Sequence, residues 1–121
     1  MASAPLADRL RHLLEAVKRI ELRTTGMSFE DYQADWVTRD VVERNLERIS
    51  EASRHIPQDL KARHPKIGWR LIADLGNVLR HAYDQIVDER IWDIVRENVA
   101  PLKAAVEVLL REVDESDPAR D

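Results

Sequence analysis

The chain has 121 residues, 44% of them hydrophobic, and a formal net charge of −4 at pH 7. This length predicts one domain spanning residues 1–121, and the absence of cysteine excludes disulfides, thiolate nucleophiles and zinc sites built on sulfur. The negative charge argues against a dedicated nucleic-acid scaffold, and the lack of an apolar signal or a span of about 20 apolar residues predicts a cytoplasmic protein without membrane contact.

The first predicted element is a long amphipathic helix that begins near Leu6 and ends near Gly26. Its apolar residues recur every three or four positions, with charged residues between them: Leu6, Leu10, Leu13, Leu14, Val17 and Ile20. Gly26 suits the left-handed backbone that commonly ends a helix. Ser28 then predicts the cap of a short second helix, because acidic residues follow it in the first turn.

Two further long helices and one short helix are predicted in the middle of the chain. Residues 38–56 carry one apolar face, and this helix should end before Pro57. A short helix follows over residues 57–64, and residues 69–82 form the third long helix. Gly76 lies inside that third helix, where glycine costs about 1 kcal/mol relative to alanine.

The last predicted helix starts near Asp88, which we expect to cap it, and keeps its periodicity to Leu110. Pro101 predicts a kink or a restart, and residues 114–121 form a polar tail that we expect to fray. Four long helices with two short accessory helices predict a compact all-α bundle. Apolar faces in excess of one core would favour a dimer.

Residues 76–83, at the end of the third long helix, are the best candidate for chemistry. Asn77 and His81 share a helical face, and Arg80 projects about a quarter turn away. A neutral histidine can accept the proton of an RNA 2′-hydroxyl, and an arginine can hold the phosphate as its charge grows, so no metal is needed. On residue types alone we favour a simpler interpretation, in which His81 only caps the helix.

Several stretches of the chain resemble one known family: residues 9–16, 26–32, 44–52, 64–73, 76–83 and 91–95. From residue 10 to residue 109 the chain resembles the HepT-like branch of the HEPN ribonuclease toxins. The resemblance implies a HEPN-type four-helix bundle that dimerises, and an endoribonuclease toxin that needs neither metal nor cofactor. The implied partner is a minimal nucleotidyltransferase (MNT-type) antitoxin, which silences the toxin by adenylylating a tyrosine.

The family signature is an arginine, four to six residues and a histidine, often extended to His-x-Tyr. It implies that His81 is the catalytic histidine, Tyr83 the modified tyrosine and Asn77 the polar residue after the arginine. Gly76 occupies the arginine position. We hypothesise that Arg80, four residues later and about 40° around the helix axis, supplies the guanidinium. The alternative is a weakened or inactive nuclease that docks on a nucleotidyltransferase and regulates it.

A basic cluster precedes the motif and could guide an RNA backbone toward it: Lys61, Arg63, Lys66 and Arg70. A solvated surface accounts for these charges without a function, and we favour that interpretation. The three tryptophans at positions 36, 69 and 92 fall at apolar helical positions, so we expect core packing or dimer contact rather than base stacking. The other histidines lack metal-ligand spacing, and no metal site is predicted.

Overall fold

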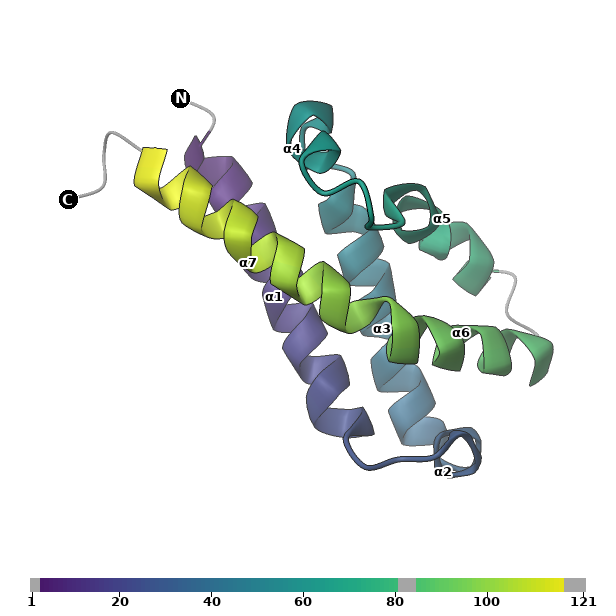
Figure 1. The fold of residues 1–121 in the computed structure, drawn as a ribbon. Coiled ribbons are helices and arrows are strands. Elements are labelled where there is room, and N and C mark those ends of the chain that lie inside the picture. The colour runs from purple at the N-terminus through teal and green to yellow at the C-terminus, as the bar shows by residue number, and fades with distance from the viewer. Residues whose placement is uncertain (1–2, 81–84, 117–121) are drawn as a thin grey trace.

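The computed structural model describes residues 3–80 and 85–116, and every regular element within them is a helix, which confirms the predicted all-α class. The helices are drawn in Figure 1. They are α1 (Ser3–Thr24), α2 (Phe29–Ala34), α3 (Trp36–Ser53), α4 (Gln58–Ala62), α5 (Trp69–Arg80), α6 (Gln85–Glu97) and α7 (Val99–Ser116). None of these described helices is long and apolar enough to cross a bilayer.

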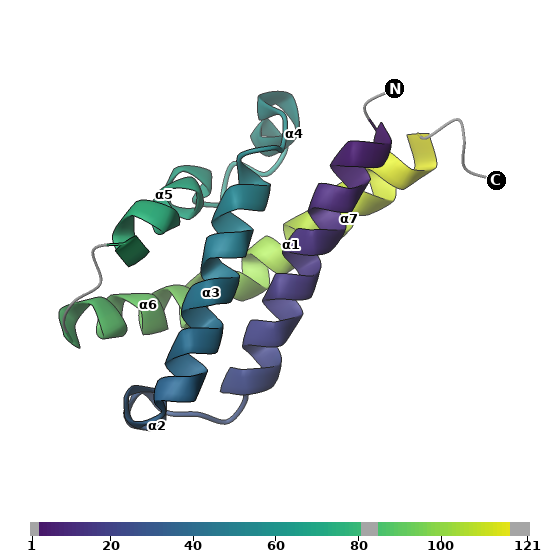
Figure 2. The same cartoon turned by 180° about the vertical axis from the view of Figure 1, so that it is seen from behind.

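The helices form two layers, which Figures 1 and 2 show from opposite sides. α1 and α3 pack side by side as an antiparallel pair joined through α2, and α5 packs along the other side of α3. α6 and α7 form the second layer, with α7 packed on α1. One broad face of the molecule is therefore formed by α1, α3 and α5.

The core is built from the apolar faces of both layers. Its largest fully buried side chains include Leu10, Leu13, Val17, Ile20, Leu46, Ile49, Ile72, Leu75, Ile91, Leu102 and Leu109. Each such side chain contributes roughly 1.5–3 kcal/mol by leaving water. The ring of Tyr32 stacks on that of Trp92 with centroids 5.0 Å apart, which ties α2 to α6.

The predicted turn between the first two helices is confirmed. Gly26 has a φ of +80°, the left-handed conformation that favours glycine. Ser28 caps α2 through a capping box: its hydroxyl accepts from the backbone N–H of Asp31, whose carboxylate accepts in return from the backbone N–H of Ser28. Asp35 then caps α3, so this helix begins at Trp36, two residues earlier than predicted.

The last predicted helix is in fact two helices, α6 and α7, separated at Asn98. Pro101 lies in the first turn of α7. Backbone N–H groups in a first turn have no partner within the helix, so the missing N–H of proline costs no helical hydrogen bond. Asp88 lies in the first turn of α6 and does not cap it, contrary to the prediction. The tail prediction is wrong for residues 114–116, because α7 continues to Ser116 and Asp114 accepts from Arg11 at 2.9 Å.

The three tryptophans differ in their surroundings. Trp92 is buried in the core, whereas Trp69 is half-buried and its indole N–H donates to the backbone carbonyls of Lys61 and His64, both at 3.1 Å. Trp36 is 65% exposed, so core packing is wrong for this residue. Among described residues, Leu22 and Val37 are the other exposed large hydrophobic side chains.

Candidate nucleic-acid interface

A groove of about 590 Å³ opens on the face formed by α1, α3 and α5. α3 lies between the other two helices on this face, as Figure 2 shows. The residues that line the groove are Arg9, His12, Glu15, Ala16 and Arg19 from α1, Arg44, Glu47, Arg48, Ser50, Glu51, Ala52 and Arg54 from α3, and Gly76 and Arg80 from α5. The C-terminal end of α5 therefore reaches the groove.

Helical periodicity explains why these side chains share one surface. On α1 the lining residues include positions 9, 12, 16 and 19, and on α3 they include positions 44, 47, 51 and 54. Both sets have the spacing of three and four residues that places side chains on one helical face. Each row extends about 15 Å, because ten residues of helix rise about 1.5 Å each.

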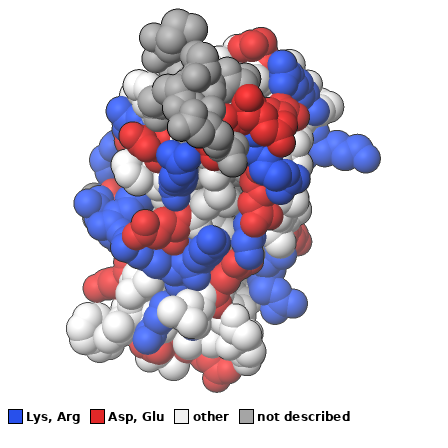
Figure 3. Space-filling model, turned by 90° about the vertical axis from the view of Figure 1, so that its left-hand side faces the viewer, with Lys and Arg blue, Asp and Glu red and all other residues white. Residues whose placement is uncertain are grey.

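The groove carries a positive charge that the whole chain lacks. Six arginines and three glutamates line it, a surplus of three positive charges when His12 is neutral, whereas the chain as a whole carries −4. On the side of the molecule drawn in Figure 3, lysines and arginines are interleaved with aspartates and glutamates. The arginine-rich groove is thus a local feature, of the kind that attracts anions.

Only some of the groove's charges are neutralised by neighbours. Arg19 pairs with Glu15 on the next turn of α1, and Glu51 contacts His55 at 3.1 Å. Arg9, Arg44 and Arg48 make no hydrogen bond or ion pair with any residue in the described ranges 3–80 and 85–116. Within these ranges, nothing competes with a ligand for their guanidinium groups.

The carbonyl oxygen of Ala73 fastens α5 to α3. It accepts from the hydroxyl of Ser50 at 2.9 Å, and from Nε and Nη2 of Arg54 at 3.1 and 2.7 Å. Ser50 is buried, so its hydroxyl would be costly to leave without a partner. These bonds hold the second turn of α5 against α3, beside the groove.

The guanidinium of Arg80 folds back along α5 toward Gly76. Its Nη1 lies 3.9 Å from the point where a Cβ on Gly76 would stand, and its Nη2 donates to Oδ1 of Asn77 at 2.9 Å. Nδ2 of Asn77 in turn donates to Oδ1 of Asp74 at 3.1 Å. Side chains three residues apart on a helix are neighbours, so this hydrogen-bonded row follows from the sequence spacing.

The structure brings together three of the residues predicted around the motif, namely Gly76, Asn77 and Arg80. His81 and Tyr83, the predicted catalytic histidine and modified tyrosine, lie outside the described residues. α5 is described through Arg80, the residue directly before His81. The described part of the site is therefore the guanidinium, the amide that orients it and the groove beside them.

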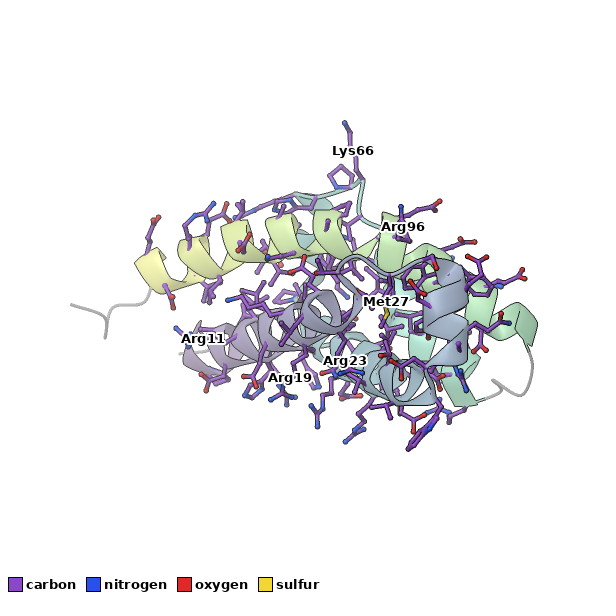
Figure 4. All side chains as sticks on the ribbon, turned by 90° about the horizontal axis from the view of Figure 1, so that it is seen from below. Arg11, Arg19, Arg23, Met27, Lys66 and Arg96 are labelled. Carbon is purple, nitrogen blue, oxygen red and sulfur yellow. The ribbon has the colours of Figure 1, made fainter. Side chains whose placement is uncertain are left out.

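The predicted basic cluster does not line the groove. Lys61 lies over the ring of Trp69 at 5.9 Å, and burial lowers its pKa. Arg63 pairs with Glu112 of α7 at 2.7 Å. In Figure 4 Lys66 projects from one edge of the molecule and Arg19 lies toward the other.

Arg70, the fourth member of that cluster, is nearer the groove. It lines a neighbouring hollow together with Leu71, Ala73 and Asp74. Arg54 lines both this hollow and the groove, so the two surfaces adjoin at one guanidinium.

The arginines of α1 and α3 were not among the predicted site residues. The available signal was the four-residue spacing of Arg44 and Arg48, and the ten-residue spacing of Arg9 and Arg19, which matches that of Arg44 and Arg54. That spacing is also common on solvated helices, so it carries little weight alone. Only the packing of α1, α3 and α5 around one groove distinguishes these arginines from the others.

Sequence comparisons relate the chain to known proteins. The family model described as ribonuclease HepT-like matches residues 13–109. A protein named probable ribonuclease HepT, from Thermococcus cleftensis, is 40% identical over 102 residues, covering 84% of this chain and 93% of that protein. A protein provisionally named an RNase, from Methanocaldococcus jannaschii, is 33% identical over 108 residues, covering 89% of each chain. No solved structure matches.

Proposed function

Because the chain belongs to the ribonuclease HepT-like family, we propose that it is an endoribonuclease that cleaves RNA without a metal at the end of α5. The observation that carries this proposal is the position of Arg80. Its guanidinium lies beside Gly76, where the family signature has an arginine, and at the rim of a positively charged groove. His81, the next residue in the chain, supplies the imidazole.

The proposed reaction uses three side chains. The imidazole of His81 accepts the proton of a 2′-hydroxyl, whose oxygen attacks the adjacent phosphorus. The bond from phosphorus to the 5′-oxygen breaks, and that oxygen takes a proton from water as it leaves, which gives a 2′,3′-cyclic phosphate and a 5′-hydroxyl. Arg80 stabilises the growing charge on the phosphoryl oxygens, and the amide of Asn77 orients the guanidinium through its hydrogen bond.

Purified protein tests this proposal directly. We expect cleavage of single-stranded RNA in buffer with excess EDTA, and a loss of at least about 100-fold in rate for His81→Ala. His55→Gln is the matched control, because it removes a histidine that does not line the groove. Absence of cleavage, or full activity of His81→Ala, would overturn the mechanism.

We further propose that the nuclease is the toxin of a two-component system whose antitoxin is a minimal nucleotidyltransferase. In this proposal the hydroxyl of Tyr83 attacks the α-phosphorus of ATP, an O–P bond forms and pyrophosphate leaves. The chain has two tyrosines, and Tyr32 is fully buried. Tyr83 is therefore the tyrosine that we expect an enzyme to modify on the folded protein.

Intact-mass analysis after incubation with the nucleotidyltransferase and ATP tests the modification. We expect a gain of adenylate on the wild-type chain and none on Tyr83→Phe. Parallel loss of RNA cleavage in the wild type alone would link the modification to silencing. An unchanged mass would remove the modification proposal and leave the nuclease proposal standing.

Gly76 favours one other function. Without an arginine at that position, the chain would act as a catalytically weak subunit that docks on a nucleotidyltransferase and regulates it. Expression of the chain alone distinguishes the two functions. A nuclease toxin should arrest growth in a manner that depends on His81, whereas a docking subunit should not.

We also propose, from family membership, that the protein acts as a homodimer in the cytoplasm. The exposed side chains of Leu22, Trp36 and Val37 are apolar surface that a second copy could cover. Light scattering should give twice the mass of the chain. A monomer at micromolar concentration would contradict this assembly.

A further inference from the structure

We propose that the α1 and α3 walls of the groove bind the phosphate backbone of single-stranded RNA and lead it to Arg80. Arg9, Arg44 and Arg48 are the phosphate-binding residues in this proposal. The identity of the ligand as RNA rests on the proposed ribonuclease function. The presence of an anion-binding groove rests on the geometry alone.

The unpaired state of these three arginines is the first argument. Some arginines elsewhere on the surface have carboxylate partners, such as Arg11 with Asp114 at 2.9 Å and Arg63 with Glu112 at 2.7 Å, whereas Arg90 and Arg111 are scattered exposed residues that line no common groove. Arg9, Arg44 and Arg48 have no carboxylate partner within the described part of the chain. Guanidinium groups stay charged at all ordinary pH values and bind phosphate through two parallel hydrogen bonds, so a phosphodiester is the ligand they suit.

The dimensions of the groove are the second argument. Two rows of side chains, each about 15 Å long, flank a volume of about 590 Å³ that opens beside Gly76 and Arg80. This space holds a few nucleotides of a single strand, whereas a double helix is too wide to enter it. A single strand is also the form in which a 2′-hydroxyl can rotate into line with its phosphate.

The composition of the lining is the third argument. It contains six arginines and no tryptophan, tyrosine or phenylalanine from the described residues. Single-strand binding proteins that hold bases use aromatic side chains for stacking, whereas contacts to phosphate carry no sequence information. The groove should therefore bind RNA of different base sequence with similar affinity.

Glu47 provides an independent probe of the groove. It lines the groove between Arg44 and Arg48 on α3 and makes no ion pair with a described residue. A carboxylate at this position repels phosphate, so Glu47→Gln should tighten RNA binding. A gain of affinity cannot arise from misfolding, which a loss could.

Fluorescence anisotropy with oligouridylate and oligoadenylate probes tests the proposal. The full chain carries His81→Ala so that the probe stays intact, and the buffer contains EDTA. Arg44→Gln with Arg48→Gln should raise Kd about tenfold or more, and should reduce the slope of log K against log salt by roughly 1.4, because two phosphate contacts are lost at about 0.7 each. Glu47→Gln should lower Kd, and the two probes should differ little.

Arg90→Gln with Arg111→Gln is the matched control, because both arginines are exposed and belong to α6 and α7. Equal Kd and salt slope for the groove and control variants would overturn the proposal. A strong preference for one probe would overturn the backbone contact, and a change from dimer to monomer without loss of RNA affinity would assign the groove to a second copy. If the wild-type protein binds RNA in a salt-dependent way but does not cleave it, the result contradicts the nuclease function and supports the RNA-binding groove.

Discussion

Nη1 of Arg80 lies 3.9 Å from the place where a side chain on Gly76 would begin. The guanidinium of residue 80 therefore lies next to the space that a side chain on residue 76 would enter. Nη2 of the same group donates to Asn77 at 2.9 Å, so the side chain is held in this direction. This geometry is the basis of our proposal that a guanidinium from position 80 serves the groove as one from position 76 would, because the two positions are one helical step apart.

The first prediction concerns the exchange of these two positions. Arg80→Gln should lower the rate of RNA cleavage by about 100- to 1,000-fold, the usual effect of removing one group that stabilises transition-state charge. Adding Gly76→Arg to Arg80→Gln should restore most of that rate, because the guanidinium returns to the same space. Initial rates with a fluorescent RNA substrate measure both effects.

Arg90→Gln serves as the control for charge alone, since Arg90 is exposed on α6. Unchanged cleavage by Arg80→Gln would make Arg80 a solvated surface residue. Loss of cleavage without recovery in the double variant would show that the guanidinium cannot be delivered from position 76.

The second prediction is that Gly76→Ala stabilises the protein. A Cβ at this position would lie 3.8 Å from Oγ of Ser50, an ordinary van der Waals contact, so nothing in the described structure requires glycine. Alanine in a helix interior is favoured over glycine by about 0.5–1 kcal/mol. Urea denaturation should show that gain in the free energy of unfolding, and a loss would reveal a contact that position 76 makes in the assembled protein.

The sequence predicts the helices and most of their ends well, because those features depend on neighbouring residues. Gly26 in the left-handed conformation and Ser28 as the cap of α2 are both local, and both are confirmed. α3 ends before Pro57 as predicted, although its last residue is Ser53 and not residue 56. The start of α3 was placed two residues late, because Trp36 follows its cap directly and does not join the apolar face.

Features that depend on packing between distant segments were not predictable in the same way. The groove needs Arg9, Arg44 and Arg80 on one surface, and no local pattern says that α1 and α5 lie on either side of α3. The sequence predicts the break between α6 and α7 at Pro101, but the break lies at Asn98. Proline fits the first turn of a new helix, so α7 begins before Pro101. Within the motif, residue spacing alone does not predict that the guanidinium of Arg80 turns back toward Gly76.

The third prediction concerns the cap of α3. Oδ2 of Asp35 accepts from the hydroxyl of Thr38 at 2.7 Å and Oδ1 accepts from its backbone N–H at 3.1 Å, and these bonds hold the pKa of Asp35 below its ordinary value. Because the pKa is lower in the folded state, the ionised carboxylate stabilises the fold at pH values above the pKa of the unfolded state. This stabilisation is lost as the pH falls through the pKa of the folded state. Asp35→Ala should therefore lower the thermal midpoint by several degrees at pH 7, with a smaller difference below about pH 4.

Asp35→Asn separates the cap from its charge, because asparagine is also a good N-cap. Its midpoint at pH 7 should lie between those of the wild type and Asp35→Ala. A constant difference between wild type and Asp35→Ala at every pH would contradict a role for the carboxylate charge.

The fourth prediction concerns Glu43 on α3. Burial, followed by the nearby charges of Asp88 and Asp40, raises the pKa of this carboxyl. The ionised form is therefore disfavoured in the folded state at neutral pH, and the penalty disappears as the pH falls through the raised pKa. Glu43→Gln should increase the free energy of unfolding at pH 7 by up to about 1 kcal/mol, because the group is only partly buried. Urea titrations at pH 7 and pH 4 should show the gain only at the higher pH; Glu115→Gln, which is exposed on α7, is the control.

The fifth prediction concerns the hydroxyl of Tyr32. The side chain is fully buried against Trp92, burial raises its pKa, and its hydroxyl has no hydrogen-bond partner among the described residues. A buried hydroxyl without a partner costs about 1–3 kcal/mol, so Tyr32→Phe should raise the free energy of unfolding by about 1 kcal/mol while keeping the stacked ring. Tyr32→Ala should lower it by about 3–5 kcal/mol, because the ring itself is lost from the core. Chemical denaturation measures both, and a loss of stability in Tyr32→Phe would mean that the hydroxyl bonds to a group beyond the described residues.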